Sequence, residues 1–356
     1  MKAALLFISL FALSMLIIPL LLSQRPGVSQ SPPPGAAVEG LSDIQQPPPK
    51  EPAAITEGPA QSPGDKPYPQ VAHEFRILDE TTGEIHTISA GDFVRGAVAA
   101  EMPARFHPEA LKAQAVAAHT YALRRQLLEA ANPNPSLKGA DFSADPGNML
   151  VYITEEKARE FYGHAADEYW PKICEAADSV LNLVLFYEEE PIVAAYHAMS
   201  AGSTEDAANV WVGGAPYLIP AKSAGDLLAP DYETSRRFSA EEARSLLRAE
   251  YPDMELGGDP GGWFGEITLS PSGYTTKVVV GGEPLRGSDI RRIFGLRSHS
   301  FDILTDDNGV AFVVRGYGHG VGLSQYGADF MARQGHSFSE ILETYYVGAE
   351  LRVLAG

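Results

Sequence analysis

One glutamate, Glu101, stands where a predicted helix gives way to a loop, and its neighbours along the chain are apolar. Alanines precede it, and Met102 and Pro103 follow it. An apolar environment favours the protonated carboxyl and so raises its pKa, and a general acid requires a raised pKa near neutral pH. A glutamate at a helix end is more commonly a solvated surface residue, so this position alone leaves both interpretations open.

A second segment, residues 196–206, combines small hydroxylated residues with a glycine and leads to Trp211 and Tyr217. Aromatic rings offer apolar faces on which sugar rings stack, and hydroxyl groups match sugar hydroxyls. The segment therefore suits carbohydrate binding, with Ser200 and Thr204 as candidate binding residues. A turn that buries a tryptophan in the core is the alternative, and it accounts for the same residues equally well.

A third segment, residues 316–328, begins with a run, 316–322, in which every second residue is a glycine. Such glycines allow the backbone to approach a ligand closely or to turn tightly. The segment lacks the lysine of a phosphate-binding loop and the spacing of a dinucleotide fingerprint, which disfavours phosphate binding. No second metal ligand stands at a paired spacing from His319, so we expect no metal site and a hydrogen-bonding role for this histidine.

Helices and strands in irregular order must bring these segments together. We expect a helix at 93–100 with Asp92 as its N-cap, stopped by Pro103, and a second from Pro108 to about Ala130. Further helices are predicted at 154–169, 171–182 and 239–248, and after the capping box formed by Ser337 and Glu340. Strands are predicted at 74–78, 84–88, 183–187 paired with 192–196, 264–269, 275–280, and 301–304 paired with 310–314. The pattern predicts a mixed α+β fold.

The N-terminal residues predict attachment to a membrane. Residues 3–22 carry no charge and can cross a bilayer as a helix, and Lys2 before them favours a cytoplasmic N-terminus. We interpret residues 1–23 as a single-pass anchor; a cleaved signal peptide is the alternative, but no small-residue cleavage site follows Leu22. Residues 24–72 are rich in proline and predict a disordered linker. Residues 73–356 then form the extracytoplasmic catalytic domain.

Charge and cysteine usage exclude other classes of protein. The chain of 356 residues has a net charge of −19 and no basic run, so we expect no binding to nucleic acid. Its one cysteine, Cys174, has no second thiol nearby, which excludes a C-x-x-C metal or redox motif.

Together, the three segments resemble the stage II sporulation protein D family of lytic transglycosylases. The similarity is carried by EMP at 101–103 with LKAQAVAA at 111–118, by LRG at 285–287 with FGLRS at 294–298, and by GHGVGLSQYGA at 318–328. It spans roughly residues 75–353, and it implies a single elongated catalytic domain with a substrate cleft. The chain departs from the family pattern at His119, where members usually have arginine, at Tyr317, where tryptophan is common, and at Leu323, which replaces a methionine. Some relatives carry a cysteine-containing zinc site, but residues 141–152 hold no cysteine, so we predict no zinc.

The resemblance implies cleavage of the MurNAc-β-1,4-GlcNAc bond of peptidoglycan to give 1,6-anhydroMurNAc ends, with Glu101 as the catalytic residue and no cofactor. The strands cleaved would be denuded of stem peptides, in septal wall remodelling during forespore engulfment. Implied partners are an amidase-endopeptidase and a membrane protein that recruits both enzymes. Two alternatives stay open: a hydrolase of the same polymer, either a muramidase or an amidase, and a non-catalytic wall-binding module. The candidate glycan-binding residues are Gln114, Ser200, Thr204, His319, Ser324, Gln325 and Tyr326.

Overall fold

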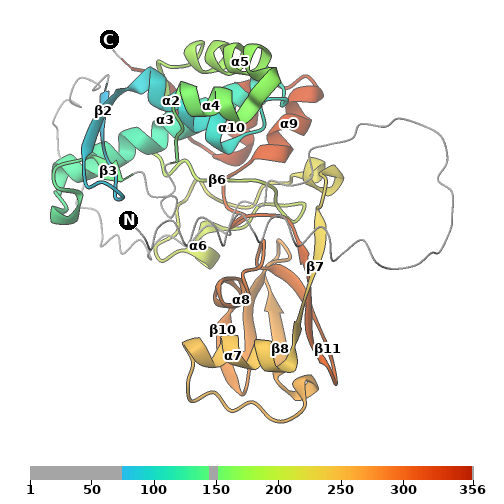
Figure 1. The fold of residues 1–356 in the computed structure, drawn as a ribbon. Coiled ribbons are helices and arrows are strands. Elements are labelled where there is room, and N and C mark those ends of the chain that lie inside the picture. The colour runs from blue at the N-terminus through green and yellow to red at the C-terminus, as the bar shows by residue number, and fades with distance from the viewer. Residues whose placement is uncertain (1–73, 144–150, 355–356) are drawn as a thin grey trace. The chain divides into compact units, whose positions relative to one another are not determined.

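The computed structural model describes residues 74–143 and 151–354, all within one compact unit of the chain (Figure 1). These residues form a mixture of helices and several small sheets, which confirms the predicted α+β class. The predicted anchor at 1–23 and the whole of the predicted linker at 24–72 fall outside the described residues, as does residue 73. No helix in the described part of the chain is both long and apolar enough to cross a membrane.

The first hydrophobic core is built around α3 (Pro108–Ala131), the longest described helix. Its alanine-rich stretch from Ala113 to Leu123 is buried throughout, because side chains this small let neighbouring helices approach closely. The helices around it are α2 (Ala90–Glu101), α4 (Glu155–Tyr162), α5 (Ala166–Asp178), α9 (Gln325–Arg333) and α10 (Phe338–Tyr345). Figure 1 shows these helices gathered in one group.

Two small sheets border this helical core. In the first, β1 (Glu74–Leu78) pairs antiparallel with β2 (Ile85–Ser89) and parallel with the short β3 (Phe142–Ser143). In the second, β4 (Leu183–Tyr187) lies between β5 (Glu190–Pro191) and β14 (Glu350–Val353), antiparallel to both. The end of the chain thereby closes against residues near its middle.

A second hydrophobic core lies between two further three-stranded sheets and two helices. One sheet contains β7 (Glu233–Ser239), β12 (Gly309–Arg315) and β11 (Ser300–Asp306); the other contains β8 (Phe264–Leu269), β9 (Thr275–Val280) and β10 (Glu283–Arg286). The helices are α7 (Ala240–Glu250) and α8 (Gly287–Phe294). Phe312 is its aromatic centre, with ring centroids 4.6 Å from Phe294 and 5.6 Å from Phe301.

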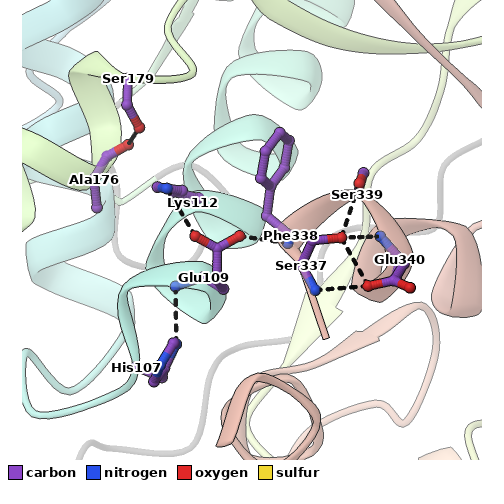
Figure 2. Close-up of polar contacts among 9 residues, drawn as sticks. All are labelled: His107, Glu109, Lys112, Ala176, Ser179, Ser337, Phe338, Ser339 and Glu340. Carbon is purple, nitrogen blue, oxygen red and sulfur yellow. Dashed lines mark hydrogen bonds and ion pairs between the residues drawn. The ribbon is translucent and has the colours of Figure 1, made fainter. Parts of the chain in front are cut away.

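The start of α3 is tied to the start of α10 by one carboxylate, as Figure 2 shows. Glu109 accepts a hydrogen bond from the backbone N–H of Phe338 at 2.8 Å, and its other oxygen lies 2.7 Å from Nζ of Lys112. Charge-assisted bonds of this kind are stronger than neutral ones. His107 caps α3 by accepting from the N–H of Glu109 at 3.3 Å.

Three element predictions need correction. The first helix starts at Ala90, because Ser89 and not Asp92 is its N-cap; Asp92 lies in the first turn. Pro171 lies inside α5 and does not start a helix, since α5 begins at Ala166 and runs through it. The predicted hairpin partner of β4 at 192–196 is displaced: β4 pairs with the shorter β5 and with β14, and Tyr196 belongs to β6 (Tyr196–His197), which pairs elsewhere.

Candidate active site

Backbone pairing interleaves the second and third segments. The two-residue strand β6 (Tyr196–His197) runs parallel to β13 (Leu323–Ser324). Beyond it, Met199 and Tyr317 exchange both backbone hydrogen bonds, at 3.1 and 2.8 Å. Residues more than a hundred positions apart in the chain therefore share one irregular framework.

The glycines of the third segment make this pairing sterically possible. Gly318 has φ +113°, and a Cβ there would lie 2.6 Å from Cβ of His197. Gly322 has φ +72°, and a Cβ there would lie 2.1 Å from the carbonyl oxygen of Ala195. Residues other than glycine seldom adopt such φ values. The close approach predicted from these glycines is therefore one between two parts of the chain itself.

Side chains from α3 and α9 join the first segment, which comprises residues 95–103 and 107–123, to the third. Gln325 Nε2 donates to Gln114 Oε1 at 3.3 Å, and both residues are buried. The ring of Tyr326 packs edge-on against Phe106, with centroids 5.0 Å apart. Gln114 is also hydrogen-bonded to the side chain of Tyr196. The structure thus brings Gln114, Gln325 and Tyr326, three of the predicted glycan-binding residues, together around the loop that follows Glu101.

Glu101 is the last residue of α2, and its side chain is only partly accessible to solvent. Burial raises the pKa of its carboxyl from an ordinary value of 4.5 to about 7, because desolvation disfavours the charged form. Among the described residues, no hydrogen-bond donor or cation offsets this effect. A carboxyl with a pKa of about 7 can both donate and accept a proton at neutral pH.

Two tyrosines lie close enough to Glu101 to respond to its charge. The pKa of Tyr196 is raised first by burial and next by the Glu101 carboxylate. The pKa of Tyr317 is likewise raised mainly by burial, with a smaller contribution from Glu101, while Arg297 lies 4.5 Å above the centre of the Tyr317 ring. At Glu101 the first segment therefore comes within electrostatic range of one tyrosine from each of the other two segments.

The loop after Glu101 is fixed by a lysine from α5. Lys172 Nζ donates to the carbonyl oxygens of Ala104 at 2.8 Å and Phe106 at 2.6 Å. On the other side of the loop, the carboxylate of Asp329 accepts from the backbone N–H of His107 at 2.7 Å. These contacts fix the backbone of residues 104–107, which directly follow the loop residues next to Glu101.

The three predicted hydroxyl-bearing residues are engaged within the protein. Ser200 donates to Asp226 through its backbone N–H at 2.8 Å and its hydroxyl at 2.5 Å, and the Ser324 hydroxyl donates to the other oxygen of Asp226 at 2.7 Å. The Thr204 hydroxyl accepts from the N–H of Ala221 at 2.8 Å. The side chains of these two serines and one threonine are buried, so they hold the loops in place around Tyr196 and Tyr317.

His319 and His119 are uncharged near neutral pH. Burial lowers the pKa of His319 well below its ordinary value, and His319 Nδ1 accepts from the N–H of Val321 at 3.1 Å. Its ring centroid lies 5.2 Å from that of Trp211. His119 is buried in α3 beside Phe75, and burial lowers its pKa to about 4. Among the described residues, no group of three His, Cys, Asp or Glu side chains is placed to hold a metal ion.

Sequence reasoning missed four residues of this region: Tyr196, Tyr317, Lys172 and Asp226. Tyr196 and Tyr317 lie inside the second and third segments. Their positions, next to His197 and between two glycines, were the signal that could have identified them. Lys172 and Asp226 lie in segments without any motif, and only the tertiary structure reveals their contacts.

Comparison with known proteins places the chain among sporulation proteins. A family model described as "Stage II sporulation protein" matches residues 79–187. Proteins named "Stage II sporulation protein D" match over long stretches. That of Bacillus subtilis (strain 168) is 35% identical over 268 residues, 75% of each chain, and that of Bacillus amyloliquefaciens is 32% identical over 319 residues, 89% of each chain. A protein of Bacillus subtilis (strain 168) named "Amidase enhancer" is 26% identical over 72% of this chain and 40% of its own length.

Proposed function

Because the chain belongs to the stage II sporulation protein D family, we propose that it is a lytic transglycosylase that cleaves peptidoglycan glycan strands during sporulation. The family supports a role connected with sporulation and the cell wall. The observation that carries the proposed chemistry is the carboxyl of Glu101, which has a pKa of about 7 and lies within electrostatic range of tyrosines from the other two segments.

In the proposed reaction, Glu101 acts first as an acid and then as a base. The protonated carboxyl donates its proton to the oxygen that links C1 of MurNAc to GlcNAc, and the C1–O bond breaks. The resulting carboxylate takes the proton of the MurNAc C6 hydroxyl, whose oxygen forms the new bond to C1. The products are a 1,6-anhydroMurNAc end and a GlcNAc with a free 4-hydroxyl, and Glu101 regains its proton without consuming water.

An intramolecular nucleophile removes the need for a second catalytic carboxylate, because it is already held next to the reacting carbon. A hydrolase normally uses two carboxylates. The other buried carboxylates near the three segments are occupied: Asp226 by Ser200 and Ser324, and Glu205 by Ser270, the N–H of Asp206 at 2.7 Å and Asn209 at 3.0 Å. This arrangement favours the single-carboxylate mechanism over the muramidase alternative.

The setting of the reaction is part of the same proposal. Residues 1–23 would anchor the chain in the cell membrane with the N-terminus in the cytoplasm. The proline-rich residues 24–72 would let the catalytic domain reach the wall, and a substrate cleft in that domain would bind the glycan strand. Partners would be an amidase-endopeptidase that strips stem peptides and a membrane protein that recruits both enzymes.

A second candidate function is a non-catalytic wall protein that stimulates an amidase, and the name of the amidase enhancer relative favours it. One experiment separates the two: the full-length chain and Glu101→Gln are incubated with purified glycan strands, and the products are identified by mass spectrometry. Anhydro ends from the unchanged chain alone would support the transglycosylase. Reducing ends would indicate a hydrolase. Binding without cleavage by both proteins, together with stimulation of a purified amidase, would support the second candidate.

A further inference from the structure

A pocket of about 380 Å³ lies beside the loop that follows Glu101. Its walls come from the loop itself, from α9, and from the short 3-10 helix η3 (Ala224–Leu228) with the turn after it. The wall formed by η3 is closely packed, because a Cβ on Gly225 would lie 2.3 Å from Cβ of Phe330. The side chains used below are Arg105, Phe106, Tyr326, Asp329, Phe330 and Arg333.

The pocket retains one uncompensated positive charge. Arg333 pairs with Asp329 at 2.8 Å, and the other oxygen of Asp329 accepts the backbone N–H of His107 at 2.7 Å. Arg105 is exposed, and in the described part of the chain no carboxylate lies within ion-pair distance of it. A free guanidinium beside aromatic side chains is notable in a chain whose net charge is −19, because most nearby anions would be repelled unless a local cation held them.

The pocket is also close to the candidate acid. Arg105 follows Glu101 by four positions, so their Cα atoms are at most about 14 Å apart even in a fully extended chain. The turn closed by the N–H of Phe106 and the carbonyl of Pro103, at 2.9 Å, shortens this distance. Such a separation is on the scale of one disaccharide repeat of a glycan strand.

We propose that this pocket is a subsite for an acidic sugar of the strand that Glu101 cleaves, and that Arg105 binds the free lactyl carboxylate of a muramic acid residue. The inference rests on the proposed function. A planar guanidinium pairs with a carboxylate through two parallel hydrogen bonds. The partly exposed rings of Tyr326 and Phe330 supply apolar surface for the sugar ring.

The subsite has a consequence for substrate choice. A stem peptide is attached to muramic acid through the lactyl carboxyl, and the amide bond it forms carries no negative charge. Arg105 therefore distinguishes strands whose peptides have been removed from strands that retain them. It is a specificity-determining residue, and the proton transfers remain with Glu101.

The test uses two substrates that differ in one group: peptide-free strands with free lactyl carboxylates, and the same strands with these groups converted to methylamides. Full-length Arg105→Ala and Arg105→Lys are compared with the unchanged chain. Arg248→Ala, which removes an exposed arginine from α7 beside the other core, is the matched control. For Arg105→Ala we expect the ratio of kcat/KM on the two substrates to fall about tenfold, the loss of one charge-assisted contact. Arg105→Lys should keep part of the preference, and the control should keep all of it.

Binding measured in the Glu101→Gln background separates this inference from the proposed function. Calorimetry with both strands is performed on Glu101→Gln and on the double variant with Arg105→Ala. If the unchanged chain cleaves neither substrate but Arg105 decides which strand is bound, the proposed function fails and the subsite stands. If the strands are cleaved and Arg105→Ala leaves both the kcat/KM ratio and the binding preference intact, the subsite is refuted and the function stands.

Discussion

Replacing Glu101 by glutamine is expected to abolish glycan cleavage and, above pH 7, to stabilise the folded chain. Glutamine keeps nearly the shape of the side chain but cannot ionise. In the folded chain the carboxyl has a pKa of about 7, against 4.5 for an ordinary glutamate. Its environment therefore opposes the charged form, and the charge costs stability at any pH at which the unfolded chain would ionise.

The sign and size of the effect follow from proton linkage. Between pH 4.5 and pH 7 the folded chain binds more protons at this site than the unfolded chain, so the free energy of unfolding falls as the pH rises. Below pH 4.5 both states are protonated and the penalty vanishes. Above pH 7 both are ionised and the penalty is complete, at about 3 kcal/mol for a difference of this size. Partial solvent access makes this figure an upper limit.

Urea unfolding at pH 4, 5, 6, 7 and 8, followed by tryptophan fluorescence, measures this dependence, since Trp170 lies in the first core. Glu101→Gln should match the unchanged chain at pH 4 and exceed it by up to about 3 kcal/mol at pH 8. Glu343→Gln, at an exposed position of α10, should leave the difference near zero throughout. A glutamine variant that is less stable than the unchanged chain at pH 8 would refute the argument that the carboxyl is desolvated without a partner.

Three further predictions concern the residues around this carboxyl. Lys172→Met removes two hydrogen bonds to the loop after Glu101, and we expect the free energy of unfolding in urea to fall by about 2 kcal/mol. A looser loop admits water to Glu101, so the limb of the kcat/KM profile that reports the pKa of this carboxyl should shift to lower pH. Asp226→Asn withdraws the charge that holds two loops together, and it should lower the melting temperature at pH 7 and reduce kcat more than it changes KM; an unchanged kcat would show that these loops do not position the site. Gly318→Ala meets both a positive φ and a side chain, whereas Gly139→Ala meets a positive φ in open space. The first should therefore cost at least about 1 kcal/mol more than the second in thermal unfolding, and equal costs would contradict the close packing described.

Local signals in the sequence were enough to predict much of the secondary structure. The capping boxes at Ser239 and Ser337 mark helix starts that the structure reproduces, because their hydrogen bonds lie within one turn. Pro108 marks the start of α3 for a similar reason. Pro171 misled the prediction, since a proline that is favourable at the first turn of a helix also fits inside α5 here.

The candidate site was predictable only in part, because its properties come from contacts across the chain. Glu101 could be singled out from its apolar neighbours, but the raised pKa depends on packing that no neighbouring residue encodes. The hydroxyls of Ser200 and Ser324 looked suited to sugars, yet a single buried carboxylate, Asp226, takes both. Sequence reveals the type of a polar group, whereas its partner is decided by tertiary structure.

The approach of distant segments to Glu101 also makes its acidity a late product of folding. Tyr317 follows Glu101 by 216 positions, and contacts that close such long loops form slowly because their entropic cost precedes their reward. Before those contacts exist, the carboxyl is an ordinary solvated acid, ionised at neutral pH and unable to protonate a glycosidic oxygen. Under the proposed mechanism, a nascent or partly folded chain would therefore not cleave the wall, and the raised pKa of Glu101 would appear only when these contacts have formed.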